Sequence, residues 1–333
     1  MENSFIKSVK VSLIIVYLVI TAGAIVRMTG SGMGCPDWPK CFGYWIPPTE
    51  RFQLDWKSNQ LYSKGQVIIL DEELRVAKSN FNSTLDYNPK NWEFYTQHDY
   101  ALFNPYHTWI EYINRLLGAL AGLAVLVMTV LSFLLKKKKK IIPIISFFIL
   151  MAMVFQAWLG KIVVDSNLLP YRITIHMFMA LLIVFGLIIL LFMSRRKIRP
   201  IPASRLMKIF ALSAAALTLF QIGLGTQVRQ FVDLKMDLKV SQWLDPAPLK
   251  FYFHRSLSLV VLAVHLTLFW MLHKININLR VFNQILGLIG LEIFTGILMF
   301  YLDFPISSQP LHLIIAALLF GAQSLFIFRI MVK

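Results

Sequence analysis

Charged residues are scarce in this chain. Only 15% of its 333 residues are Asp, Glu, Lys or Arg, whereas 57% are hydrophobic, and a soluble domain usually carries about a quarter charged residues. The mean hydropathy is +0.64, and several apolar runs reach the roughly 20 residues that a membrane-spanning helix needs. This composition excludes an ordinary soluble domain and predicts an integral membrane protein.

Acidic residues are few, at 17 against 33 basic residues, and the formal net charge is +16. A basic balance suits nucleic acid, but the chain lacks a basic region interleaved with aromatic residues. The basic residues instead lie in short runs between apolar segments, as they do at the cytoplasmic ends of membrane spans. We therefore expect a lipid bilayer as a partner and no nucleic acid.

The N-terminal region lacks the features of a removable targeting segment. Lys7 and Lys10 precede an apolar run that leads to Arg27 without a small-residue cleavage site, so an uncleaved first helix is expected. No segment rich in Arg and Ser precedes it, which favours a bacterial cytoplasmic membrane over an organelle.

The apolar runs predict an all-α membrane protein of eight transmembrane helices. Basic clusters, including 136–140 and 195–199, follow every second run, so both termini are expected to be cytoplasmic. The long segment 28–107 then lies outside, and it is too long for a tight connection, so it is expected to have some structure of its own. The expected helices are 9–27, 108–135, 141–163, 172–194, 205–228, 252–273, 281–301 and 310–330.

An internal repeat relates the two halves of the chain. The matching sets are Gly23–Arg27 with Gly225–Arg229, Asn114–Arg115 with His254–Arg255, and Gln156, Gly160 and His176 with Glu292, Gly296 and His312. Repeats of this kind predict two structural units with the same fold. We therefore expect two four-helix bundles of the same orientation, in residues 1–200 and 201–333.

Three histidines, His176, His254 and His312, lie near the outer ends of the predicted helices. His254 and His312 come from the second and fourth helices of one bundle, and two facing imidazoles are what a six-coordinate haem iron requires. A single interfacial histidine is also explained by hydrogen bonding at a helix end. The repeated placement favours haem binding, because an ionisable group in a span is costly without a partner. His265 has no counterpart in the repeat and is expected to lie in the core or in an interhelical hydrogen bond.

The first half lacks the matching histidine pair. Asn114 stands at the position of His254, and an amide is a poor iron ligand, so a haem there would be held by His176 unless His107 reaches it. Glu111 lies one turn before Asn114 on the same helical face. A half with both ligands suits electron transfer, whereas a half with an open position and a carboxylate suits chemistry on a bound porphyrin. An ordinary ion pair with Arg115 is the alternative role for Glu111.

Four arginines, Arg27, Arg115, Arg229 and Arg255, lie at outer helix ends, against the positive-inside trend. Arginine recognises carboxylates in bidentate geometry, and haem propionates are carboxylates, so these residues are propionate candidates. Structural arginines that extend to the membrane surface are the alternative.

Cysteine occurs only at Cys35 and Cys41. The outer compartment permits disulfides, and the short segment between them contains two prolines and can turn tightly. Two cysteines are too few for a structural zinc site, which needs four ligands. A disulfide is expected, with either a structural or a redox role.

Together these residues resemble the haem A synthase family over nearly the whole chain. Gly23–Cys41 is similar to that family's first outer loop, and Glu111–Arg115 is similar to its Glu-x-x-His-Arg motif. His176, His254 and His312 fall where the family keeps its other haem ligands.

The resemblance implies oxidation of the C8 methyl of haem O to a formyl group by successive hydroxylations, with electrons from an unspecified donor. It implies that His254 and His312 hold a haem b cofactor, that the first half holds the substrate haem, and that Glu111 assists at the methyl. It also implies a disulfide near the substrate site with a part in electron or haem transfer. A haem O synthase is the expected supplier of substrate, and a homo-oligomer is compatible with the sequence.

Two features depart from the family. Asn114 replaces a haem-ligating histidine, and the outer segment from about 45 to 107 is longer than in other bacterial members. Two rival functions share some of the evidence. A di-haem electron carrier without substrate chemistry shares the histidines but leaves the difference between the halves unexplained, and a transporter built from repeats predicts no tightly bound haem.

Overall fold

The structure is a computed structural model of the chain. It describes residues 2–96, 103–135, 140–166, 168–194, 200–236, 238–275, 277, 280–305 and 307–332. The basic residues expected at 136–139 and 195–199, and residues 97–102 of the outer segment, lie outside the described residues.

Eight helices in the described part are long and apolar enough to cross a membrane, as the sequence predicts. They are α1 (Glu2–Met28), α2 (Pro105–Phe133), α3 (Ile141–Asp165), α4 (Pro170–Ser194), α5 (Arg205–Asp233), α6 (Leu249–Lys274), α7 (Arg280–Tyr301) and α8 (Ser308–Met331). The expected start of the first helix at residue 9 is wrong. Phe5 and Val9 are buried in the core, so tertiary packing extends α1 beyond the apolar run.

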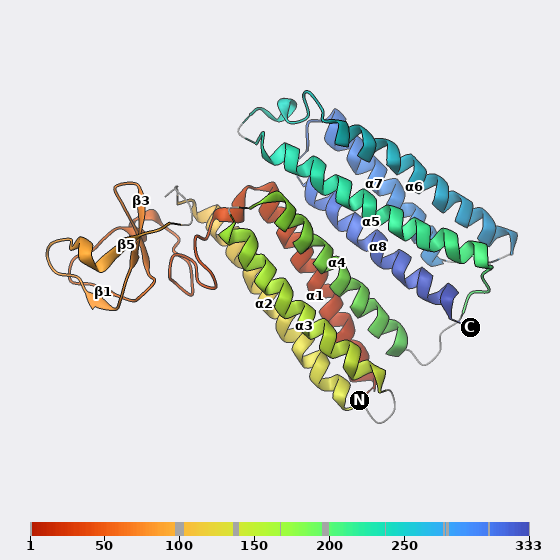
Figure 1. Ribbon diagram of the computed structural model, residues 1–333, viewed down its shortest axis with the longest axis horizontal. Coiled ribbons are helices and arrows are strands. Elements are labelled where there is room, and N and C mark those ends of the chain that lie inside the picture. Colours follow the sequence, from red (N-terminus) through yellow and green to blue (C-terminus); the bar gives the residue numbers. More distant parts are fainter. Residues whose placement is uncertain are drawn as a thin grey trace.

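The helices lie side by side in two groups, α1–α4 and α5–α8 (Figure 1). Helix α8 contacts both α1 and α4 and so joins the groups. Both chain ends lie at the end of the helices opposite to the strands (Figure 1), as an even number of crossings requires. Which end faces the cytoplasm, and the division at residue 200, stay predictions.

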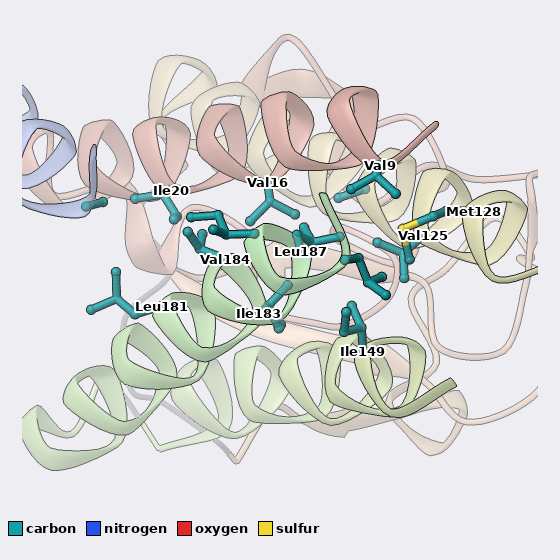
Figure 2. Packing of buried hydrophobic residues seen from close by; sticks show 14 of the residues in the cluster. Val9, Val16, Ile20, Val125, Met128, Ile149, Leu181, Ile183, Val184 and Leu187 are labelled. Carbon is teal, nitrogen blue, oxygen red and sulfur yellow. The ribbon is translucent and has the colours of Figure 1, made fainter. Parts of the chain in front are cut away.

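The core of the first group is aliphatic. Figure 2 shows Val16 of α1, Val125 of α2, Ile149 of α3 and Leu187 of α4 between the helices, all of them buried. Large apolar side chains also point outward, as Phe148 does on α3. An apolar exterior suits helices in contact with lipid tails.

The outer segment folds into a small unit of antiparallel strands. They are β1 (Leu61–Tyr62), β2 (Val67–Leu70), β3 (Glu73–Ala77), β4 (Phe81–Asn82) and β5 (Trp92–Phe94). One sheet pairs β1 with β4, and the other has the order β2-β3-β5. Tyr62 and Trp92 pack edge to face between the sheets, with ring centroids 4.9 Å apart. The all-α expectation therefore holds for the membrane part, and the structure expected in the outer segment is β.

Candidate functional site

Two histidine rings face each other in the second half. The ring centroids of His254 on α6 and His312 on α8 lie 6.3 Å apart, with the ring planes at 76°. One iron between two imidazoles, with metal–nitrogen bonds of roughly 2 Å, separates the ring centroids by about 6 Å. Nδ1 of His254 is buried and has no hydrogen-bond partner among the described residues. The separation of the two rings therefore fits a haem iron that both residues would hold.

The neighbouring helix α7 orients the ring of His312. Its Nδ1 lies 3.0 Å from Glu292 Oε2 and 2.8 Å from Thr295 Oγ1. A carboxylate accepts hydrogen bonds, so Nδ1 carries the hydrogen and Nε2 is left for a metal. Metal-ligating histidines are commonly held in this way by a carboxylate on the other ring nitrogen.

Glycines make room for both rings. A Cβ on Gly225 of α5 would lie 3.1 Å from His254 Cε1, and a Cβ on Gly296 of α7 would lie 3.8 Å from His312 Cε1. The first contact is tighter than ordinary van der Waals distance, so a larger residue at Gly225 would displace the ring. The glycines of the repeat therefore allow each helix to approach the imidazole of the next.

The first half places a similar glycine beside the imidazole of His176, but the contact with the ring differs. A Cβ on Gly160 of α3 would lie 3.4 Å from His176 Cε1 on α4. Gln156 takes the place of Glu292, and its Nε2 lies 3.3 Å from His176 Nε2 and 3.1 Å from the His176 carbonyl oxygen. His176 thus has an uncharged amide at Nε2, and its buried Nδ1 has no hydrogen-bond partner among the described residues, whereas His312 has a carboxylate at Nδ1.

Asn114 occupies the position that His254 has in the second half. A Cβ on Gly23 of α1 would lie 4.0 Å from Asn114 Oδ1, as Gly225 faces His254. This oxygen is buried and, within the described ranges, has no hydrogen-bond partner. His107 lies seven residues earlier on α2, about 10 Å further out along the helix axis. The structure therefore brings Asn114, and not His107, to the level that corresponds to the histidine pair.

Glu111 is held by the outer loop that follows α1. The residue is buried, with a relative exposure of 3%. Oε2 accepts a hydrogen bond of 2.9 Å from the Cys35 amide, and Oε1 accepts one from Arg115. The ion pair with Arg115 thus exists, and the carboxylate is also fastened to the cysteine loop.

Arg115 binds the same loop through three backbone carbonyls, those of Cys35, Asp37 and Lys40. Burial raises the pKa of the Asp37 carboxyl, while hydrogen bonds from backbone amides and the charge of Arg115 lower it. Because so many of its donors are engaged, Arg115 acts here as a clamp between α2 and the loop.

Cys35 and Cys41 form the expected disulfide. Both residues are 0% exposed and pack in one cluster with Leu54 and with Val67 and Ile69 of β2. The β unit therefore covers the disulfide. A buried disulfide beneath a folded unit fits a structural role better than a redox role.

Arg27 and Arg229 meet at the outer junction of the two halves. Arg27 pairs with Asp233 at 2.6 Å, and Arg229 pairs with the other oxygen of Asp233 at 2.8 Å. Arg229 also donates to the Arg27 carbonyl at 2.9 Å. Arg255 lies elsewhere, with its guanidinium 5.3 Å from the centroid of the Tyr252 ring.

The family described as cytochrome oxidase assembly protein has a sequence model that matches residues 8–324. The chain belongs to this family. It is 24% identical over 349 residues to the haem A synthase of Rickettsia prowazekii, covering 96% of this chain and 95% of that protein. It is 30% identical over 191 residues to the haem A synthase of Shewanella oneidensis, covering 57% of this chain and 44% of that protein.

A third relative, the haem A synthase of Ehrlichia canis, is 29% identical over 189 residues, 54% of this chain and 47% of that protein. The chain thus spans about half the length of two of these relatives and nearly all of the third. The resemblance drawn from the sequence is confirmed, as is the multi-pass membrane architecture.

Two residues that contact the candidate site residues, Thr295 and Asp233, are not among the candidates from the sequence. Thr295 lies one turn after Glu292 on α7 and shares its contact with His312. Asp233 lies four residues after Arg229, at i,i+4 spacing. That spacing is a usable signal, but the helix expected from the apolar run ends at residue 228, whereas α5 continues to Asp233.

Proposed function

We propose that this protein is a haem A synthase, which oxidises the C8 methyl of haem O to a formyl group. One observation carries the proposal, namely the difference between two halves of the same design. The second half presents the facing pair His254 and His312. At the same positions the first half presents Asn114 and His176, with the carboxylate of Glu111 one turn further out.

In the second half, His254 and His312 are the proposed ligands of a haem b cofactor. A bound haem b supplies one-electron transfer. The chain's own contribution is the fixed ring orientation, in which Glu292 and Thr295 hold Nδ1 of His312 and leave Nε2 for a metal. A haem held by both His254 and His312 would be suited to electron transfer rather than to substrate chemistry.

In the first half, His176 is the proposed ligand of the substrate haem O. Asn114 occupies the position that corresponds to His254, and because an amide is a poor iron ligand, a haem held there by His176 would be suited to substrate chemistry. His107 remains an alternative ligand only if the haem lies closer to the outer surface.

Glu111 is the proposed catalytic carboxylate. Hydrogen bonds from the Cys35 amide and Arg115 engage both of its oxygens, so its position is preorganised. A fixed negative charge stabilises positive charge that develops on the substrate, or orients a water molecule. The disulfide loop thus contributes by holding Glu111 in place.

The arginine candidates divide into two kinds. Arg27 and Arg229 share the single carboxylate of Asp233, so one positive charge is left over where the two halves meet. We propose that this excess attracts haem propionates, with Arg255 as a further candidate. Arg115 is already engaged with the loop and with Glu111 and is the weakest propionate candidate.

The proposed setting is a bacterial cytoplasmic membrane. There haem O would arrive from a haem O synthase, and electrons would come from a separate donor. A homo-oligomer is compatible with the proposal.

Pigment analysis of purified protein tests the function, with haem O supplied by co-expression. The wild-type protein should carry haem b and yield haem A. Glu111→Ala should keep haem b and accumulate haem O or partly oxidised haem, and Glu111→Gln should separate the loss of charge from the loss of the side chain. Normal haem A formation by Glu111→Ala would refute the role of this residue, and wild-type protein that carries haem but never yields haem A would favour the electron carrier.

A further inference from the structure

A buried polar trio lies deeper in the second half, formed by Thr218 of α5, His265 of α6 and Gln323 of α8. Their relative exposures are 3%, 1% and 3%. Gln323 Nε2 donates to Thr218 Oγ1 at 2.8 Å and lies 2.9 Å from His265 Nε2. These contacts join three helices, and they bear out the interhelical hydrogen bond expected for His265.

The hydrogen bonds of the trio have a defined direction. Nδ1 of His265 lies 2.7 Å from the Val261 carbonyl oxygen, which only accepts, so Nδ1 carries the hydrogen. In the neutral ring Nε2 then accepts from Gln323. The amide of Gln323 uses one hydrogen for His265 and the other for Thr218. The trio is therefore a cross-link that needs no charge.

The repeat shows that helix packing alone does not require this trio. The repeat, which aligns Gly225 with Gly23, His254 with Asn114 and His312 with His176, places the trio opposite three aliphatic residues of the first half. They are Val16, Val125 and Leu187. All three are buried in the first-half core (Figure 2). The polar version occurs only in the half that presents two facing imidazoles.

The trio and the histidine pair lie on the same helix faces. His265 follows His254 by eleven residues on α6, and Gln323 follows His312 by eleven residues on α8. Eleven residues are about three turns, or roughly 16 Å along the axis. The two helices are therefore joined by side chains at two levels, by the facing imidazoles near the outer end and by His265 and Gln323 below them.

We propose that Thr218, His265 and Gln323 are positioning residues that hold α6 and α8 in register for the two haem ligands. A directional side-chain hydrogen bond limits sliding and rotation of one helix against another, which aliphatic packing permits more readily. Two axial ligands on different helices need this constraint, because both nitrogens must reach one iron. At the corresponding level the first half has one imidazole, that of His176, and aliphatic side chains suffice there. This inference rests on the proposed haem b site of the second half.

Electron paramagnetic resonance of the purified protein tests the proposal, because the signal of a low-spin haem depends on the angle between its two imidazole planes. That angle is 76° here, so the wild-type protein should show the strongly axial signal of nearly perpendicular ligands. The variant Thr218→Val, His265→Val and Gln323→Leu carries the first-half residues. It should retain haem b but give a shifted or split signal, with part of the haem high-spin.

A matched control separates positioning from stability. Leu268→Ala removes a buried side chain from the hydrophobic core of the second half. It should lower the unfolding temperature without changing the haem signal. Thr218→Ser keeps the hydroxyl and should keep the wild-type signal, whereas Thr218→Val should shift it. This pair decides the question if the triple variant does not accumulate as folded protein.

An unchanged signal in the triple variant at full haem content would overturn the positioning role, and so would an equal shift in Leu268→Ala. Failure of the proposed haem b site would be seen earlier and differently. In that case the wild-type protein itself would lack a low-spin haem, and His254→Ala would lose none.

Discussion

Replacing Glu292 by glutamine should raise the reduction potential of the haem b proposed for the second half. The carboxylate lies 3.0 Å from His312 Nδ1, and with a metal–nitrogen bond of roughly 2 Å on the other side of the ring it would lie about 7 Å from the iron. Two unit charges at that distance interact by about 2 kcal/mol at an effective dielectric constant of about 20. For a one-electron couple this equals roughly 100 mV.

The sign follows from charge. Reduction adds an electron beside the carboxylate, which opposes it, so the wild-type potential is low and Glu292→Gln should raise it. The side chain is 16% exposed, and solvent screening reduces the interaction, so a rise of roughly 50–100 mV is expected.

Redox titration of the haem b absorbance measures the shift. Glutamine keeps the size of the side chain and stands at the equivalent position, Gln156, in the first half. Thr295→Val is the matched control, because it removes a neutral partner of the same ring nitrogen and should shift the potential less. An unchanged or lower potential in Glu292→Gln at full haem content would refute the electrostatic reasoning.

Further predictions concern the glycine beside His254 and the buried disulfide. Gly225→Ala places a Cβ 3.1 Å from His254 Cε1 and should lower haem b content severalfold by absorbance, whereas Gly290→Ala, with no atom within 4 Å of its Cβ among the described residues, should leave it unchanged. The 0% exposure of Cys35 and Cys41 predicts that the folded protein resists reduction and alkylation until it is denatured, and that serine at both positions lowers the free energy of unfolding by about 2 kcal/mol. Rapid reduction and alkylation of the disulfide in the native protein would contradict that burial.

The amino-acid sequence by itself determined the membrane architecture of this protein. A helix crosses a bilayer only if its apolar run has a suitable length, so the length of each run decides whether it can span the membrane. The repeat could also be recognised from the sequence, because the spacing of Gln156, Gly160 and His176 recurs at Glu292, Gly296 and His312. The disulfide was expected because the only two cysteines lie in a segment predicted to be outside the membrane. These are properties of local sequence and of its periodicity.

Only the tertiary structure decided which side chains meet. Periodicity shows which face of a helix points inward, but it does not show which residue of another helix lies opposite. The sequence pattern therefore does not reveal that Glu111 accepts a hydrogen bond from the Cys35 amide, 76 residues away in the chain. Nor does it reveal that His265 contacts Gln323, 58 residues away. The β unit over the disulfide was hidden for a related reason, since its strands are short and gain their order from packing with one another and with the loop beneath them.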